Sequence, residues 1–202
     1  IRMKKIYFLL LILITSLSLN AQDKVVLKQT FIKVKPGNNY AEDLKTKFGE
    51  LAQKRIDAGY QEAWHLWEVV DNPQAPFTHL IVEPVLISQM EKEWTREGWL
   101  EMRNEAIPGM TDSDWQAFME GVRNKRDIVA EAMFVTVTDV KRDNDTSLPS
   151  DVGVVNWMKV KEGKFKTYEN MEKALYSKGL NKNDLRVGWS LAKRIDKYGV
   201  DL

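Results

Sequence analysis

Two seven-residue segments with nearly the same sequence constrain the fold of this chain most. Phe31-Ile-Lys-Val-Lys-Pro-Gly37 recurs as Trp157-Met-Lys-Val-Lys-Glu-Gly163. Four positions are identical, and two others exchange one aromatic or aliphatic residue for another. Each segment has the alternation of a strand and ends in a charged turn. A repeat of this kind predicts two copies of one folding unit.

Two further matches follow the heptapeptides in the same order. Each heptapeptide is followed by a helical pattern that opens near a tyrosine, Tyr40 or Tyr168. A strand pattern then places tryptophan two residues before leucine, at Trp64 and at Trp189. Any two amphipathic strands that end in a charged turn look somewhat alike, and this is the alternative to a repeat. Three ordered matches favour the repeat.

The first copy begins with a strand and a helix. Residues 25–35 alternate and break at Pro36 and Gly37, which predicts a strand and a turn. Apolar residues at helical spacing predict a helix over residues 40–56, with Asn39 as its N-cap. Two more strands are predicted at residues 62–70 and 77–83, joined by a loop that contains two prolines.

The rest of the first copy is a helical region and a fourth strand. Capping boxes at Ser88 with Glu91 and at Thr111 with Asp114 predict two helices. Residues 131–140 alternate as a strand. The order strand, helix, strand, strand, helical region, strand is that of a ferredoxin-like unit, so we expect an α+β fold.

The pattern restarts after a polar, turn-rich stretch at residues 141–151, which predicts a linker. A strand at 152–161, a helix at 168–176 and a strand at 185–194 follow. We therefore expect one ferredoxin-like unit at residues 22–140 and a second, incomplete unit at 152–202. The remaining elements of the second unit would lie beyond Leu202.

In this order of elements the chain resembles the dimeric α/β-barrel superfamily, in which two ferredoxin-like units pack sheet against sheet. The resemblance covers the mature chain and rests on no catalytic signature. It implies an intrachain pseudo-dimer or a homodimer, with an interior in which small ligands bind. Monooxygenases of the antibiotic-biosynthesis and haem-degrading types look like this. The resemblance therefore also implies, as an alternative, a cofactor-free or haem-dependent monooxygenase-like enzyme.

The first 21 residues have the layout of a secretory signal peptide. Two lysines after Met3 give a positive start, an apolar run fills residues 6–14, and a small, polar stretch ends at Ala21. The apolar run is too short for a membrane anchor, which needs about 20 apolar residues. We expect cleavage after Ala21 and export to the periplasm or the cell exterior.

Removal of the signal peptide changes the charge balance. It takes away three basic residues and no acid, which leaves 27 Lys and Arg against 29 Asp and Glu, a net charge of −2. The mature chain therefore has no basic footprint for nucleic acid. Without cysteine it forms no disulfide and has no thiolate chemistry, so its stability must come from its hydrophobic core.

Both histidines of the chain, His65 and His79, fall in the hairpin of the second and third strands. Pairing of Trp67 with His79 would put the imidazoles on one face, and a slip of one residue would put them on opposite faces. The sequence leaves this register open. A general base, a haem ligand or a metal ligand is the functional interpretation, and structural or surface histidines are the alternative. No spaced carboxylate or cysteine supports a metal site.

Seven tryptophans are a high number for this length, and those in strand patterns are candidates to line a pocket for a flat ligand. Trp94 and Trp115 are expected to pack their helices on the sheet instead. With the two histidines, the candidate ligand-binding residues are Trp64, His65, Trp67, His79, Trp157 and Trp189.

Known catalytic motifs are missing from the sequence. It has no glycine-rich phosphate loop, no Gly-x-Ser-x-Gly elbow and no His-Glu-x-x-His helix, so a nucleotide-binding protein, a hydrolase of this type and a zinc protease lack support. The catalytic residues, if the chain is an enzyme, stay unknown, and no metal is predicted. Three hypotheses follow. The preferred one is an exported α/β-barrel protein that binds a small apolar or aromatic ligand between its sheets. The others are the monooxygenase-like enzyme, with haem as the one cofactor considered, and a structural or interaction protein of the envelope.

Overall fold

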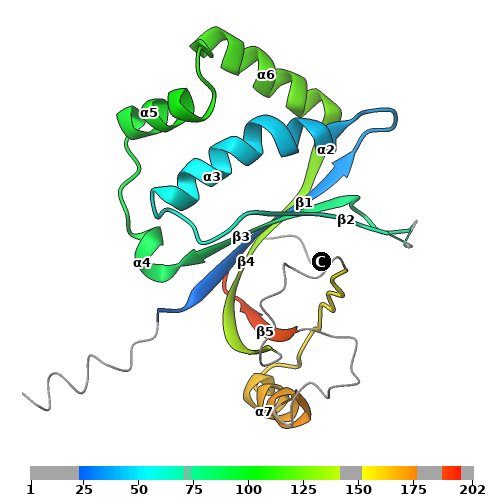
Figure 1. The fold of residues 1–202 in the computed structure, drawn as a ribbon. Helices are drawn as coiled ribbons and strands as arrows, with labels where there is room; N and C mark the ends of the chain where they lie inside the picture. The colour runs from blue at the N-terminus through cyan, green and yellow to red at the C-terminus, as the bar shows by residue number, and fades with distance from the viewer. Residues whose placement is uncertain (1–22, 71, 73, 142–151, 177–187, 197–202) are drawn as a thin grey trace, which may run out of the picture.

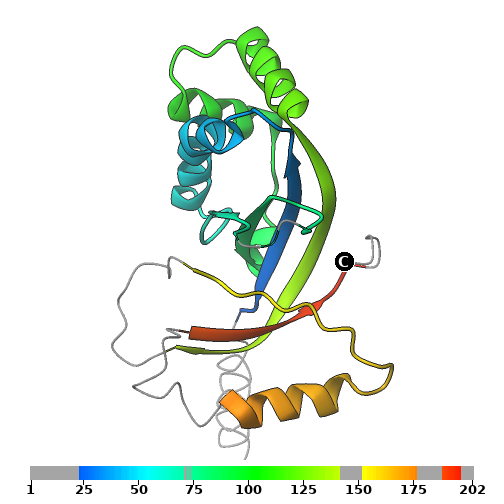
Figure 2. The same ribbon diagram turned by 90° about the vertical axis from the view of Figure 1, so that its right-hand side faces the viewer.

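A curled five-stranded antiparallel sheet lies at the centre of the structure, a computed structural model that describes residues 23–70, 72, 74–141, 152–176 and 188–196 (Figure 1). The large helices that precede β4 lie together on one face of this sheet, which we call the helix face (Figures 1 and 2). The opposite face, here the inner face, carries Phe31, Leu80, Ala130 and Ala132. The α+β class predicted from the sequence is confirmed.

The sheet has the strand order β2-β3-β1-β4-β5. The strands are β1 (Val25–Val34), β2 (His65–Glu68), β3 (His79–Leu86), β4 (Arg126–Lys141) and β5 (Gly188–Arg194). With a helical region after β1 and another after β3, the first four strands have the connectivity of a ferredoxin-like unit. At 16 residues, β4 is long enough to pair with β1 through its first part and with β5 through its second.

The helix predicted after β1 forms, with an interruption. It consists of α2 (Tyr40–Asp43), a π-helical turn η1 (Leu44–Phe48) and α3 (Gly49–Asp57). The predicted N-cap is wrong, because the side chain of Asn39 makes no capping hydrogen bond. Burial of Tyr40 and Leu44 against the sheet holds this end of the helix instead.

The second helical region contains α4 (Ile87–Met90), α5 (Arg96–Ala106) and α6 (Asp112–Lys125). The capping box predicted at Ser88 is wrong: α5 starts after Thr95, whose Oγ1 accepts a hydrogen bond from the Gly98 amide at 3.1 Å. The box at Thr111 and Asp114 is confirmed, with both reciprocal bonds at 3.2 Å. The Thr111 hydroxyl, which donates to the Asp114 carboxylate at 2.6 Å, and the Thr111 amide hold the pKa of Asp114 below its usual value.

The strand predicted at residues 152–161 is wrong. Residues 152–160 run as an irregular segment that pairs with none of the strands in the described ranges. A strand needs neighbours that complete its ladder of hydrogen bonds, so an alternating pattern by itself does not form one. The predicted elements that follow do form, as α7 (Phe165–Tyr176) and β5.

The expected signal peptide (residues 1–21) and residues 142–151 of the expected linker lie outside the described residues. Within the described ranges, no helix is long and apolar enough to cross a membrane.

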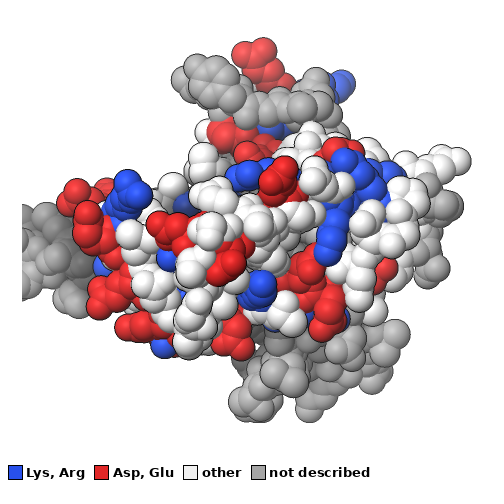
Figure 3. All heavy atoms as spheres, turned by 90° about the horizontal axis from the view of Figure 1, so that it is seen from above, with Lys and Arg blue, Asp and Glu red and all other residues white. Residues whose placement is uncertain are grey.

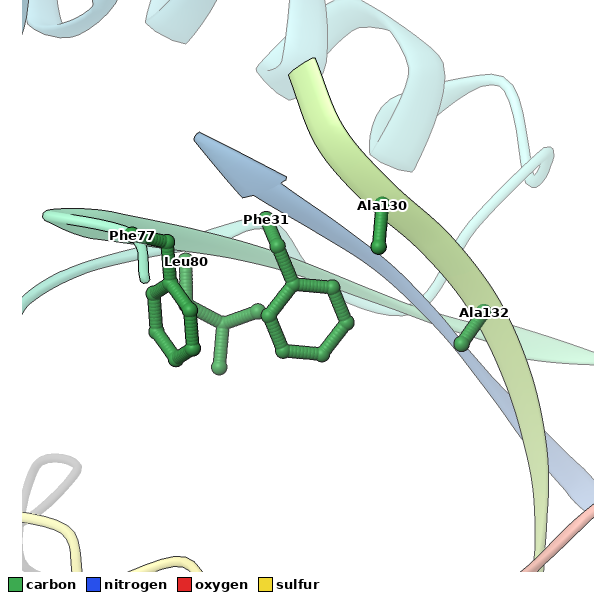
Figure 4. Close-up of a cluster of buried hydrophobic side chains, with 5 residues drawn as sticks. All are labelled: Phe31, Phe77, Leu80, Ala130 and Ala132. Atoms are coloured by element: carbon green, nitrogen blue, oxygen red, sulfur yellow. The ribbon is translucent and has the colours of Figure 1, made fainter. Parts of the chain in front are cut away.

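Hydrophobic side chains are buried on both faces of the sheet. Phe31 and Ile32 are neighbours on β1 and both are fully buried, and they point to opposite faces because strand side chains alternate. Ile32 packs with Tyr40, Leu44 and Val122 under the helices. Phe31 belongs to the inner-face cluster (Figure 4). The inner face is therefore apolar at its centre although none of the large helices before β4 covers it.

Candidate functional site: the inner face of the sheet

The register between β2 and β3 separates the two histidines. Glu68 pairs with His79, Trp67 with Leu80, and His65 with Val82. Paired residues of an antiparallel ladder lie on the same face, so His65 lies on the inner face with Leu80 and His79 lies on the helix face. The register that the sequence left open is the one that keeps the imidazoles apart.

His79 is a buried residue of the helix face. Its side of the sheet is covered, its exposed fraction is 8%, and its ring stands edge-on to Tyr40 with centroids 6.2 Å apart. Its Nδ1 lies 3.0 Å from the hydroxyl of Thr78. Burial lowers the pKa of His79, and the charge of Glu68 opposes this in part. This environment favours a neutral histidine that packs and hydrogen-bonds within the core.

His65 lies on the inner face beside Trp67, with ring centroids 6.4 Å apart. Partial burial lowers the pKa of His65, so the ring is neutral at pH 7. The haem alternative requires a histidine inside the barrel beside a cavity. Of the two histidines, His65 lies on the inner face and His79 does not.

Three aromatic rings meet over the centre of the inner face. Phe31 and Phe77 lie edge-to-face at 5.0 Å between centroids. Trp157, from the segment at residues 152–160, stands edge-to-face on both, at 5.7 Å from Phe31 and 6.0 Å from Phe77. Each such pair contributes about 0.5–1.5 kcal/mol beyond the burial of area.

Trp67 extends this aromatic surface across the sheet. It lies in the same cross-strand row as Phe31, because both are paired with Leu80. The segment at residues 152–160 also approaches this ring: a Cβ placed on Gly153 would lie 3.5 Å from the Trp67 indole. Trp157 and Gly153 thus bring one segment from beyond the first unit onto the inner face.

Gln29 occupies the next row of the inner face. Val82 on β3 and Ala132 on β4 are its direct neighbours, and His65 lies beyond Val82 in the same row. The Oε1 atom of Gln29 is buried and has no hydrogen-bond partner among the described residues. A buried acceptor without a donor is unusual in a folded protein.

On the β4 side, the residues next to this aromatic surface are alanines with short side chains. Ala130 pairs with Phe31 and Ala132 with Gln29. Figure 4 shows the Phe31, Phe77 and Leu80 side chains projecting on the side of the sheet away from the helices, with the two methyl groups farther along β4. The neighbours of Phe31 and Gln29 on β4 are therefore short, although Phe31 and Oε1 of Gln29 are both buried in this structure.

One ion pair lies at the β5 end of the inner face. Arg194 pairs with Phe134 in the ladder and binds Asp196 through Nη2 at 3.0 Å and Nε at 3.1 Å. Asp196 also accepts a hydrogen bond from the Met133 amide at 3.0 Å. The bond from Arg194 holds the pKa of Asp196 below its usual value, so the two charges balance each other.

The structure divides the six residues proposed from the sequence. It places His65, Trp67 and Trp157 on the inner face. It places Trp64 with the Ile32 cluster of the helix face, beside the side that carries His79. Trp189 stacks on Tyr176 of α7, with centroids 4.3 Å apart and ring planes at 13°.

Three inner-face residues escaped the sequence prediction: Gln29, Phe31 and Phe77. Gln29 and Phe31 carry a usable signal, because alternation along β1 puts them on one face. Alternation in the predicted strand at residues 77–83 puts Phe77 on the face of His79, which is wrong. Because β3 begins at His79, Phe77 belongs to the preceding loop and packs on the inner face.

Charged groups do not single out another site. Lysines, arginines and acids are interspersed over the helix-covered side of the molecule (Figure 3). In the part of the chain that the structure describes, no group of three or more His, Cys, Asp or Glu residues could hold a metal ion.

No protein-family model matches the chain, and no curated protein matches it. Among solved structures, the chain is similar to a dimeric ferredoxin-like protein of unknown function from Thermobifida fusca. The two are 5% identical, with a TM-score of 0.29, over 56% of this chain and 91% of that chain. A likeness this weak leaves the function to be argued from the site.

Proposed function

We propose that the inner face binds a small, flat, largely apolar molecule. The observation that carries this proposal is the aromatic surface formed by Trp67, Phe31 and Phe77. The indole of Trp157, from outside the sheet, packs on two of these rings. Aromatic side chains present large apolar area at fixed geometry, and such surfaces with a few polar groups are typical of ligand sites.

The segment at residues 152–160, which lies over this surface, is exposed, and this supports a binding face rather than a closed hydrophobic core. The segment at residues 152–160 pairs with no described strand, and Trp157 itself remains 38% exposed. Val154 and Met158 of the same segment are 83% and 62% exposed. Most side chains of the segment are exposed, so displacing it costs less free energy than opening a helix-covered core.

The test is a titration of the protein with 2-methoxynaphthalene, followed by the fluorescence of the probe. Saturable binding to the wild-type chain is expected, and Trp67→Ala should weaken it at least about tenfold, a change of about 1.4 kcal/mol. Trp94→Ala is the matched control, because Trp94 packs on Tyr60 and Trp99 away from the inner face. Absence of saturable binding of both this probe and its hydroxyl analogue 2-naphthol, or equal losses in the two variants, contradicts the proposal.

We propose further that the chain is a tandem repeat whose two units share the curled sheet as a pseudo-dimer. Gly37 and Gly163 both adopt a positive φ, 78° and 72°, in the turn that precedes a helix. Trp64 packs on the helix face, and its counterpart in the second copy, Trp189, stacks on Tyr176 of the helix α7. A crystal structure of the protein would test this: α7 and β5 must superpose on α3 and β2 with the heptapeptides in register.

Export remains a proposal that rests on the first 21 residues. Protein recovered from the periplasm or the medium should begin at Gln22, as read by N-terminal sequencing. Full-length protein that stays in the cytoplasm would rule out a cleaved signal peptide.

A further inference from the structure

The unpaired acceptor of Gln29 is the feature of the inner face that packing does not explain. Its Oε1 is buried without a donor, while its neighbours in the row are Val82 and Ala132. An apolar side chain of the same shape would avoid the cost of burying an unpaired oxygen. Such a departure from full pairing of buried polar groups is expected at functional sites.

Gln61 also has a buried Oε1 without a partner, but its location differs. It is 1% exposed and its amide donates to the carbonyl of Ala52 in α3, under the helices. Gln29 lies instead on the face that carries the aromatic surface. Of the two, Gln29 is the one that a bound molecule could reach from the inner face.

The spacing fits a bicyclic ring. Gln29 and Phe31 are two residues apart on one strand, which separates same-face side chains by about 7 Å. A flat molecule of two fused rings that lies on Phe31 and Trp67 therefore brings a substituent to the row of Gln29. The groups that close Oε1 off from water would have to move for this to happen.

The charges around the surface favour a neutral molecule. His65, in the row of Gln29, is neutral at pH 7 because burial lowers its pKa. Arg194 is already paired with Asp196. Neither group offers an uncompensated charge. Lys33, on the far side of Phe31 in β1, is exposed and donates to the carbonyl of Ala75. An ionised ligand in the row of Gln29 would therefore lose its hydration without a counter-ion beside it.

We propose that Oε1 of Gln29 accepts a hydrogen bond from the ligand, so that the site selects neutral, flat aromatic molecules that carry an O–H or N–H donor, as phenols and indoles do. The proposal rests on the proposed function and names the class of ligand for the same surface. A site built to hydrogen-bond a donor rejects the analogue that lacks it, because the buried acceptor is then left unpaired.

Two naphthalene probes of nearly the same shape test this. 2-Naphthol carries an O–H donor, and 2-methoxynaphthalene replaces that hydrogen by a methyl group. Wild-type protein should bind the naphthol about tenfold more tightly than the ether. The anion 2-naphthoate should bind more weakly than the naphthol.

Gln29→Met keeps the length of the side chain and removes the acceptor. It should bind both probes with the affinity that the wild type has for the ether, and it should melt at the same or a higher temperature. Gln53→Met is the matched control, because Gln53 is exposed on α3 and bonds to Asp57; it should keep the tenfold preference. The wild-type comparison of naphthol with ether stands even if Gln29→Met does not fold.

The failures are distinguishable. If neither neutral probe binds the wild type saturably, the proposed function falls, and this inference with it. If both bind without preference for the naphthol, or if Gln29→Met retains that preference, the role of Gln29 is refuted while the binding face stands.

Discussion

The indole of Trp157 stands edge-to-face on the ring of Phe31, 5.7 Å between centroids and at 61°. These two residues hold the same position in the two heptapeptides of the sequence, 126 residues apart. The contact therefore joins the aromatic position of the first heptapeptide to that of the second. It also makes the inner face depend on a residue that follows β4 in the chain.

Replacing Trp157 tests how much this contact stabilises the protein. Trp157→Ala should lower the free energy of unfolding by about 1–3 kcal/mol, less than a fully buried tryptophan would, because the ring is 38% exposed. Val154→Ala, on the same segment and 83% exposed, should change it by less than about 0.5 kcal/mol. Urea unfolding measures both. Equal effects would mean that the segment does not rest on Phe31.

Two glycines should respond to alanine in opposite directions. Gly37 has φ of 78° and Gly121 lies within α6, and a Cβ would meet no atom within 4 Å at either position. Gly37→Ala should destabilise by about 1 kcal/mol, because alanine is strained at positive φ. Gly121→Ala should stabilise by about 1 kcal/mol through helix propensity. Thermal unfolding of both variants checks the signs, and a stabilising Gly37→Ala would exclude the turn.

The stability of the protein should fall between pH 7 and pH 5. Burial lowers the pKa of His79 and of His65 below the usual 6.5. Below pH 6.5 the unfolded chain therefore binds protons that the folded chain does not, and the free energy of unfolding decreases as pH falls toward the folded-state pKa values. The lowered pKa values of Asp114 and Asp196 act at more acidic pH.

His79→Gln separates the contribution of the buried histidine. Its melting temperature should depend less on pH between 7 and 5 than that of the wild type, and His65→Gln should show a second, independent reduction. Calorimetry across this range gives both slopes. A wild-type stability that rises as pH falls would show that these histidines are not neutral in the folded protein.

Two isoleucines of neighbouring strands differ in burial. Ile32 is fully buried under the helices and Ile128 is 49% exposed. Ile32→Ala should cost about 2–5 kcal/mol through lost burial and the cavity left behind. Ile128→Ala should cost less than about 1 kcal/mol. Denaturant midpoints at equal slope distinguish the two, and comparable losses would contradict the placement of Ile32 in the core.

Local patterns predicted most of the first unit. The alternation at residues 25–35, the helical spacing after Tyr40 and the capping box at Thr111 all correspond to elements of the structure. These signals depend on residues a few positions apart, which is why one sequence suffices to read them. The cap predicted at Ser88 was wrong because several residues near α5 can cap a helix, and Thr95 is the one that does.

Features that depend on residues far apart in the sequence were predicted less accurately. Residues 152–160 have the apolar alternation of β1, but among the described residues they pair with no strand, whereas β1 lies between β3 and β4. Phe77 joins the inner face from a loop, and Gln29 draws attention only because its acceptor is left unpaired by the side chains around it. None of these facts is contained in a window of adjacent residues.

The two histidines separate what the sequence determines from what only the tertiary structure decides. Alternation within each strand follows from the backbone, so the sequence by itself determined that His65 shares a face with Trp67. Whether His79 shares that face depends on how β2 and β3 align. The pairing of Glu68 with His79 is set by the loop between the strands and by packing on both sides of the sheet, and only the tertiary structure decided it.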